Sequence, residues 1–268
     1  MDAIQYSPHI RSEANWQLFG PYQTRIDFGD DEWVTLRAAF AGDKANISVI
    51  TSTGEYSLHV DDLALDASGA RFGLSALFPT CFSNLQIESD KPDLSMIAPH
   101  KYELSAGVIT SWYLSPSSAF NGVFDQPPAL DEWEMTRTDA NGTLVISRYR
   151  TKESRGEYER NNLDVVYAGV HIKSDENRVV PLNFDVSDIG RVYLNGRPLA
   201  ELNNSFRAKT GPLFRGDFDR SAQTIMLPLE AGMNELVFAI SERANGWGLS
   251  AELLNMDGLE LLPIGGEF

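Results

Sequence analysis

A tryptophan between two glycines is the first feature of the sequence that has the chemistry to bind a ligand. Asn245, Gly246, Trp247 and Gly248 follow one another. Flanking glycines let an indole lie against a flat ligand such as the face of a sugar, which makes Trp247 and Asn245 candidate ligand-binding residues. Glycines in a strand also mark bulges or a close approach of two backbones. In that alternative, the indole of Trp247 fills the core.

Polar side chains suited to sugar hydroxyls occur together in residues 203–209. This stretch carries the amides of Asn203 and Asn204, the hydroxyl of Ser205 and the guanidinium of Arg207. Binding residues concentrate on loops that a rigid scaffold holds. We therefore predict that Asn203, Asn204 and Arg207 contact a ligand. The alternative is a solvated connection between two strands.

Two carboxylates at alternate positions, Asp217 and Asp219, are the candidate metal ligands. Side chains two residues apart in an extended segment point to the same side. A hard cation such as Ca²⁺ takes roughly six to eight oxygen ligands, so the two aspartates would need backbone carbonyls as partners. The alternative is a solvated acidic loop.

Motifs of several enzyme classes do not occur in the sequence. We find no G-x-S-x-G, no G-x-x-x-x-G-K-[ST] and no H-E-x-x-H. Carboxylates are plentiful, so a glycosidase pair about 5–9 Å apart stays open, but no feature singles out two of them. The residues alone therefore leave catalysis open.

The candidate site residues lie among short runs of alternating apolar and polar residues, which we predict to be strands. Turn residues interrupt the runs about every 8–12 residues, which is typical of all-β sandwiches and barrels. Asn141-Gly142 predicts a type I′ hairpin turn, and Asn195-Gly196 is a second Asn-Gly turn. Cys81, before one of the runs, is expected to be a small buried apolar residue. The predicted strands include residues 33–40, 46–50, 56–60, 82–87, 107–114, 164–172, 179–184, 191–194, 224–229, 235–240 and 248–253.

Composition limits the classes of partner. The chain has 268 residues, 43% of them hydrophobic, and a formal net charge of -16. Nucleic acid and anionic membrane surfaces would repel most of such a chain. No apolar run reaches the length of about 18 residues that spans a membrane. One cysteine excludes an intrachain disulfide, and no signal peptide is visible, so we expect a cytoplasmic protein by default.

A polar, turn-rich stretch over residues 88–104 divides the chain into two strand-rich parts. We place the boundary near residue 98, which gives domains of residues 1–98 and 99–268. A chain of this length suggests one large domain or two modest ones.

The first part resembles the C-terminal half of concanavalin A-like lectin/glucanase (laminin-G-like) domains over about residues 2–88. The resemblance depends on the order of short pieces: Asn15-Trp16-Gln17-Leu18, Glu32-Trp33-Val34, Gly42-Asp43-Lys44-Ala45, Val60-Asp61-Asp62-Leu63, Gly73-Leu74 and Phe82-Ser83-Asn84-Leu85. Further strands usually precede this region in such domains. An open sheet edge and an uncovered apolar face need a cover. We therefore expect extensive interdomain packing and a homodimer.

The second part is similar to the galactose-binding-like jelly roll of carbohydrate-active proteins, over about residues 104–263. The pieces that carry this likeness are Gly107-Val108-Ile109-Thr110-Ser111-Trp112, Ser187-Asp188, Val192-Tyr193-Leu194-Asn195-Gly196-Arg197, Leu227-Pro228-Leu229, Gly232-Met233-Asn234-Glu235-Leu236 and Gly246-Trp247-Gly248. The resemblance implies a jelly roll that often holds a structural calcium.

Together these resemblances imply two β-sandwich units, a partial lectin-like antiparallel sandwich followed by a jelly roll. The function that they imply is non-catalytic carbohydrate binding by loop hydrogen bonds and aromatic stacking. Two alternatives stay open. One is a glycoside hydrolase or polysaccharide lyase on the same scaffold, and the other is a structural or oligomerising accessory subunit. Such folds host many functions, so the site must decide among them.

Overall fold

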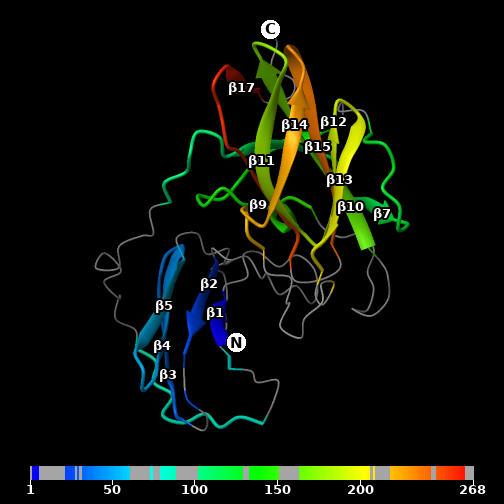
Figure 1. Ribbon diagram of the computed structural model, residues 1–268. Coiled ribbons are helices and arrows are strands. Elements are labelled where there is room, and N and C mark those ends of the chain that lie inside the picture. The colour runs from blue at the N-terminus through cyan, green and yellow to red at the C-terminus, as the bar shows by residue number, and fades with distance from the viewer. Residues whose placement is uncertain are drawn as a thin grey trace. The chain divides into compact units, whose positions relative to one another are not determined.

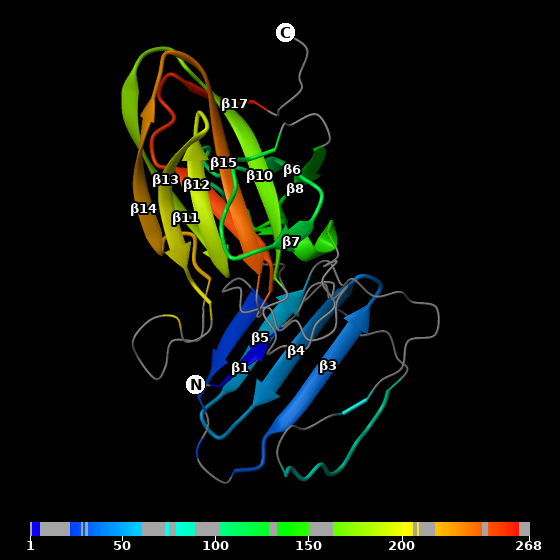
Figure 2. The ribbon, with the colours of Figure 1, turned by 90° about the vertical axis from the view of Figure 1, so that its right-hand side faces the viewer.

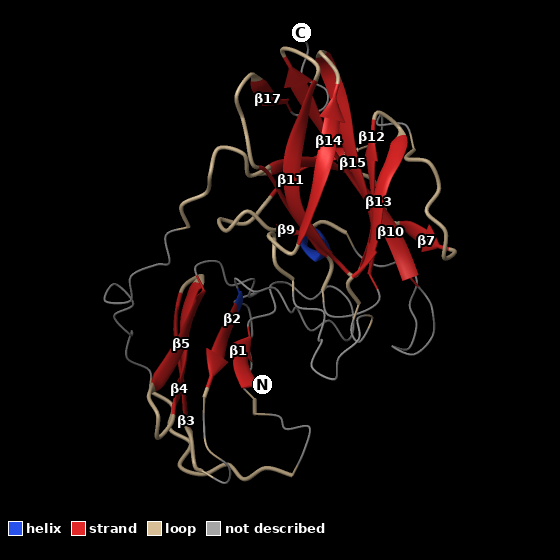
Figure 3. Ribbon diagram, in the orientation of Figure 1, coloured by secondary structure: helices blue, strands red, loops and turns tan. Residues whose placement is uncertain are grey.

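Within the residues that the structure describes, the protein is all-β, as the sequence predicts. The regular elements are strands, with a 3₁₀ turn at η4 (Ile146–Arg148) (Figure 3). No helix in this part of the chain is long and apolar enough to cross a membrane. The computed structural model describes residues 2–5, 22–27, 29, 32–60, 73–74, 79–88, 102–128, 133–150, 163–205, 208, 218–242 and 246–262.

The chain forms two compact units. The first contains residues 1–9 and 24–100, and the second contains residues 10–23 and 101–268. The domain boundary near residue 98 stays a prediction.

The first unit has a three-stranded antiparallel sheet with one apolar face. Its strands lie in the order β3-β4-β5, and β1 pairs with β2 in a second sheet (Figure 1). Side chains alternate between the two faces of a strand, so the apolar residues of β4 and β5 gather on one face. There Ala45, Val49, Leu58 and Val60 pack with Ile4 of β1. The strands are β1 (Asp2–Gln5), β2 (Gln23–Ile26), β3 (Thr35–Ala41), β4 (Lys44–Ile50) and β5 (Glu55–Val60).

The segment 79–88 is irregular, so the strand predicted over residues 82–87 is wrong. Every residue of this segment is exposed, and Asn84 has a φ of 55°. A stable strand needs a paired neighbour and a face that buries alternate side chains, and among the described residues this segment has neither. Cys81 is exposed for the same reason, which contradicts the expectation of a buried cysteine.

The second unit is a sandwich of two sheets (Figure 2). The larger sheet has the order β13-β12-β15-β10-β6-β8, and β7 and β17 also pair with β10. The smaller sheet has the order β14-β11-β16-β9. The strands are β6 (Ser111–Leu114), β7 (Ser118–Phe120), β8 (Glu134–Arg137), β9 (Leu144–Val145), β10 (Leu163–Ser174), β11 (Arg178–Ser187), β12 (Ile189–Leu194), β13 (Arg197–Asn203), β14 (Gln223–Leu229), β15 (Gly232–Glu242), β16 (Gly248–Leu253) and β17 (Leu259–Leu262).

Large side chains fill the space between the two sheets. The ring of Phe238 on β15 meets Trp112 edge-on, with centroids 5.6 Å apart, and Phe184 of the facing sheet at 5.4 Å. Trp247 belongs to the same cluster. Aromatic rings prefer such edge contacts to direct stacking, so these residues fix the distance between the layers.

The outer face of the larger sheet is also covered. Alternate residues of its central strands, such as Val165, Tyr167 and Tyr193, pack with Phe124 and Trp133 of the preceding loops. Burial raises the pKa of the Tyr167 hydroxyl to about 12. A strand buried on both faces reads as a continuous apolar run, which explains the sequence of β10. The loop that carries Phe124 thereby forms a second layer outside the sheet.

The two Asn-Gly pairs differ in conformation. Asn195 and Gly196 have φ values of 50° and 73°, as a type I′ turn requires, and connect β12 to β13. At the other pair only Gly142 has a positive φ, of 80°, and the flanking β8 and β9 belong to different sheets. The hairpin predicted at Asn141-Gly142 is therefore wrong. Asn141 instead accepts a hydrogen bond from the Thr143 amide at 2.9 Å through its own side chain.

Tyr22 packs into the second unit. Its ring lies against Val145 and Phe218. Its hydroxyl donates to Asp139, which also accepts from Arg148 Nη2 at 3.0 Å. Burial and the neighbouring Asp139 carboxylate raise the pKa of Tyr22, so the phenol stays protonated.

Candidate functional site

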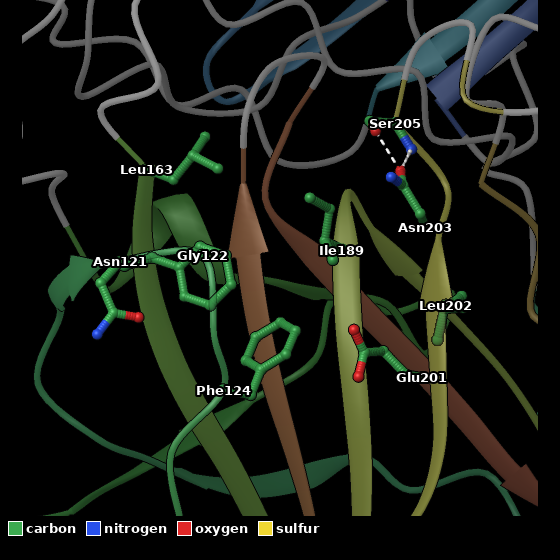
Figure 4. A pocket seen from close by; sticks show the side chains of 10 residues that line it. Asn121, Gly122, Phe124, Leu163, Ile189, Glu201, Leu202, Asn203 and Ser205 are labelled. Atoms are coloured by element: carbon green, nitrogen blue, oxygen red, sulfur yellow. Dashed lines mark hydrogen bonds between the residues drawn. The ribbon is translucent and has the colours of Figure 1, made fainter.

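A cleft of about 830 Å³ lies on the outer face of the larger sheet of the second unit (Figure 4). In β12 and β13, Ile189 pairs with Asn203, and Arg191 pairs with Glu201. These side chains alternate with inward ones such as Val192, so they stand on the face away from the main core. The cleft is lined by Phe120, Asn121, Gly122, Phe124, Leu163, Ile189, Glu201, Leu202, Asn203 and Ser205.

Two elements form opposite walls of the cleft. One wall is the end of β7 and the loop after it, which carries Asn121 and Phe124. The other wall is the end of β13, which carries Glu201 and Asn203. Figure 4 shows Phe124 and Glu201 entering the space between them from opposite sides, with Ile189 above them in this view.

The loop wall is aromatic. The rings of Phe120 and Phe124 lie 4.6 Å apart, tilted by 37°. Gly122 between them has a φ of 94°, a conformation that L side chains rarely adopt, and so lets the chain turn back. Phe120 is partly exposed, whereas Phe124 is buried. The wall therefore exposes an edge of the Phe120 ring, which packs against the buried Phe124 ring.

Arg191 joins the two walls. Its Nη1 donates to the Phe124 carbonyl at 2.9 Å, and its guanidinium lies 5.5 Å from the centre of the Phe124 ring. Its Nε and Nη2 donate to Glu201 Oε2 at 2.9 and 2.6 Å, and this contact raises the pKa of Arg191. The Tyr193 hydroxyl also holds the loop in place by donating a hydrogen bond to the Asp125 carbonyl at 2.7 Å. The cleft is thus held open before any ligand arrives.

The strand wall is polar. Asn203 Oδ1 accepts hydrogen bonds from the Ser205 amide at 3.0 Å and from the Ser205 hydroxyl. These contacts fix the amide and leave its Nδ2 without a partner among the described residues. Glu201 Oε2 is held by Arg191, and Oε1 is likewise open. The wall therefore presents one donor and one charged acceptor to the cleft.

Asn204, predicted to bind a ligand, lies beside the cleft residue Asn203 but points elsewhere. It is buried, and its Nδ2 donates to Asp185 Oδ2 at 3.2 Å. The same oxygen accepts from the Asp219 amide at 3.0 Å. Asp185 thus connects the end of the segment 163–205 to the start of the segment 218–242.

The carboxylate of Asp219 closes a local turn. Its Oδ1 accepts from the Ser221 amide at 2.9 Å and from the Ser221 hydroxyl at 2.8 Å. Asp217 lies outside the described residues. Within those residues, no group of three or more His, Cys, Asp or Glu side chains is arranged to hold a metal ion. A calcium site at Asp217 and Asp219 stays a prediction.

Trp247 fills the core of the sandwich. It is 1% exposed, and its Nε1 donates to the Ile240 carbonyl at 3.2 Å. This is the alternative role that the sequence left open, and it leaves no ring face for a sugar. Asn245 and Arg207 lie outside the described residues. Of the predicted ligand-binding residues that are described, the structure brings Asn203 to the cleft.

Sequence reasoning missed Phe120, Phe124 and Glu201. A signal for Glu201 was present, because it stands two positions before Asn203 in a strand and so shares its face. The two phenylalanines flank Asn121-Gly122 in a long loop, which is a turn signal with aromatic residues on both sides.

Comparisons with known proteins place few constraints on the chain. No protein-family model and no curated protein matches the sequence. A family 35 carbohydrate binding module from an environmental isolate is 13% identical, with 36% of this chain and 70% of that one covered and a TM-score of 0.27. A β-glucosidase from Kluyveromyces marxianus is 14% identical, with 57% and 17% covered and a TM-score of 0.35.

A third structure is the GH31 α-xylosidase of Xanthomonas citri, which is 10% identical, with a TM-score of 0.29 and with 97% of this chain and 37% of that one covered. The chain thus spans less than half the length of these two glycosidases. Because all three TM-scores are low, the function must be argued from the residues of the cleft.

Proposed function

We propose that the protein binds carbohydrate in the cleft of the second unit and does not act on it chemically. The observation that carries this proposal is the pairing of an aromatic wall, Phe120 and Phe124, with a polar wall, Glu201 and Asn203. Ligand sites combine apolar and aromatic surface with a small number of well-placed polar groups. A sugar has both an apolar ring face and hydroxyls, so it matches both walls.

Binding would use groups that are already fixed in the free protein. A sugar ring lies against the exposed edge of Phe120, its hydroxyls donate to Glu201 Oε1, and another oxygen accepts from Asn203 Nδ2. A hydrogen bond to a charged group contributes about 1.5–3 kcal/mol. Arg191 and Ser205 hold the two polar groups in place, so little entropy is lost on binding.

The number of carboxyl groups at the cleft favours binding over hydrolysis. A glycosidase uses a pair of carboxyl groups that flank the scissile bond. Among the described residues that line the cleft, Glu201 is the one with a carboxyl group, and two N–H groups of Arg191 bind its Oε2. We therefore assign it the role of a hydrogen-bond acceptor. The lectin-like character of the first unit and the galactose-binding-like character of the second are parts of the same proposal.

A glycan array with neutral oligosaccharides, run with and without a chelator, tests the proposal. We expect binding by the wild-type protein and a loss of about tenfold or more in Phe120→Ala and in Asn203→Ala, because each removes one wall's contribution. Dependence on the chelator would support the calcium site.

The control is Asn183→Ala, on the outer face of the smaller sheet, where Asn183 accepts from Thr224 Oγ1 at 2.7 Å. It should bind like the wild type. If no glycan binds to folded protein, or if all three variants keep wild-type affinity, the cleft is not a carbohydrate site.

A second candidate function, assembly with another copy, is favoured by the first unit. Strand β3 is an edge strand of its sheet, and Leu36 and Phe40 lie on the apolar face of that sheet with 58% and 44% of their surface exposed. Trp33, just before the strand, is 71% exposed. Apolar side chains on an edge strand are a ready surface for strand pairing. We propose that this edge contacts the same edge of a second copy in a homodimer.

Size-exclusion chromatography with light scattering tests this second proposal. The wild-type protein should have twice the chain mass of 29.7 kDa, and Leu36→Glu should return it to the mass of one chain. Leu85→Glu, on the exposed segment 79–88, is a control for added charge and should stay dimeric. A wild-type protein of 29.7 kDa at all concentrations would overturn the proposal.

A further inference from the structure

We propose that Glu201 makes the cleft selective for uncharged sugars and excludes sugars that carry a carboxylate. The inference rests on the proposed function and adds the chemical class of the ligand. It starts from the two oxygens of one side chain. Both N–H groups that Arg191 directs at Glu201 reach Oε2, at 2.9 and 2.6 Å, so Oε1 of this cleft-lining residue has no hydrogen-bond partner among the described residues.

The open oxygen demands a donor. An ionised carboxylate can only accept hydrogen bonds. The hydroxyls of a neutral sugar supply donors in every orientation of the ring. Where C6 faces Oε1, the carboxylate of a uronate supplies acceptors alone, and the donor of the C6 hydroxyl of the neutral sugar is lost. The loss of this hydrogen bond to a charged group lowers the affinity, although water reaches the half-exposed Glu201 side chain.

Charge acts in the same direction. Two like charges about 6 Å apart, at an effective dielectric constant of about 40, repel enough to lower affinity about tenfold. The Arg191 cation offsets part of this repulsion, but it binds Oε2 and is not among the residues that line the cleft, so a ligand at Oε1 is nearer to the carboxylate than to the guanidinium. The chain's net charge of -16 adds a longer-range repulsion of acidic polymers.

Arg191 is the positioning residue in this arrangement. Without it, the half-exposed Glu201 side chain would be free to turn away from the cleft. Lysine at this position would keep the charge, but it has no planar pair of N–H groups to hold one oxygen and free the other. The selectivity therefore depends on the pair, with Glu201 as the residue that contacts the ligand.

The experiment compares matched sugars on the array: glucose, galactose and mannose oligosaccharides and their counterparts oxidised at C6 to uronates. For the wild-type protein we expect each bound neutral sugar to bind about tenfold or more tightly than its uronate. In Glu201→Gln, which keeps the shape and the acceptor but removes the charge, the ratio should fall to about one or below. The discrimination should also shrink at about 1 M salt, where charges are screened within about 3 Å.

Glu260→Gln is the matched control, because it removes the same charge from the same unit far from the cleft. Glu260 pairs with Lys173 of β10, whereas Leu163 of β10 lines the cleft. Ten residues of strand separate Lys173 from Leu163, which is about 33 Å. This variant should keep the wild-type ratio.

Three results would be decisive. If neutral sugars and uronates bind the wild-type protein equally, the selectivity is wrong and carbohydrate binding stands. If Glu201→Gln keeps the wild-type ratio while it still binds neutral sugars, Glu201 is not its source. If no sugar binds at all, the proposed function fails first and the selectivity fails with it.

Discussion

Replacing Trp247 by alanine should lower the free energy of unfolding by about 3–5 kcal/mol. The indole is 1% exposed in the core between the two sheets. Its removal leaves a cavity that the neighbouring strands cannot close, and it frees the Ile240 carbonyl that now accepts from Nε1. Denaturant unfolding followed by circular dichroism measures the change as a lower midpoint at an unchanged slope.

Two further variants separate the loss of core packing at Trp247 from the general effect of removing a large aromatic side chain. Trp247→Phe keeps an aromatic ring and should recover a large part of the loss. Trp33→Ala, in the first unit, removes the same side chain from a site that is 71% exposed and should change stability by about 0.5 kcal/mol or less. A stable Trp247→Ala protein that had lost glycan binding would restore the stacking role that the sequence left open.

The second large effect is expected at Asp185, which the sequence did not single out. Asp185 is 0% exposed, and one of its oxygens accepts from Asn204 Nδ2 and from the Asp219 amide. Alanine would leave both donors without this acceptor in the protein interior. Because hydrogen bonds to a charged group contribute about 1.5–3 kcal/mol each, we expect a loss of about 3 kcal/mol or more. Hydrogen exchange at the Asp219 amide should accelerate along with it.

Asp185→Asn tests the importance of the charge, because it keeps one side-chain oxygen and the size of the residue. It should cost less than alanine. Asp175→Ala removes an exposed carboxylate that contacts Arg178 on the surface, and should cost about 1 kcal/mol or less. Equal stability of Asp185→Ala and Asp175→Ala would show that the buried contacts of Asp185 contribute nothing.

The strands of the second unit were largely predictable because their side chains follow simple periods. Residues 248–253 were predicted as a strand, and β16 has these bounds. The continuous apolar run 164–172 predicts a strand buried on both faces, and β10 lies between the main core and the outer cluster. The segment 82–87 also carries apolar residues at short spacing, Phe82, Leu85 and Ile87, yet the described structure gives it no partner strand. The local hydrophobic pattern indicates that a segment is able to form a strand. Pairing with a neighbouring strand decides whether it does so.

The two Asn-Gly pairs show the limit of turn signals. Both pairs have the same composition, but only Asn195-Gly196 joins strands that are neighbours in one sheet. Asn141-Gly142 connects strands of opposite sheets, where a tight hairpin would have the wrong geometry. The dipeptide indicates where the chain turns, whereas the sheet order indicates what the turn connects.

The site was predicted only in part for a related reason. The sequence predicts that Asn203 and Asn204 are equivalent residues of a loop, but β13 extends to Asn203. In a strand adjacent side chains point to opposite faces, so Asn203 reaches the cleft and Asn204 reaches Asp185. The aromatic wall comes from a distant stretch of the chain, around Phe120, and no local pattern connects the two.

Tyr22 has a consequence for any attempt to isolate the second unit. The residue stands far ahead of the boundary near 98, but its ring covers Val145 and Phe218, and its hydroxyl contacts Asp139. A polypeptide of residues 99–268 would lack Tyr22. Val145 and Phe218 would then be more exposed to water, and the partly buried Asp139 carboxylate would lose a hydrogen-bond donor. The second unit is therefore best produced together with the upstream segment that contains Tyr22.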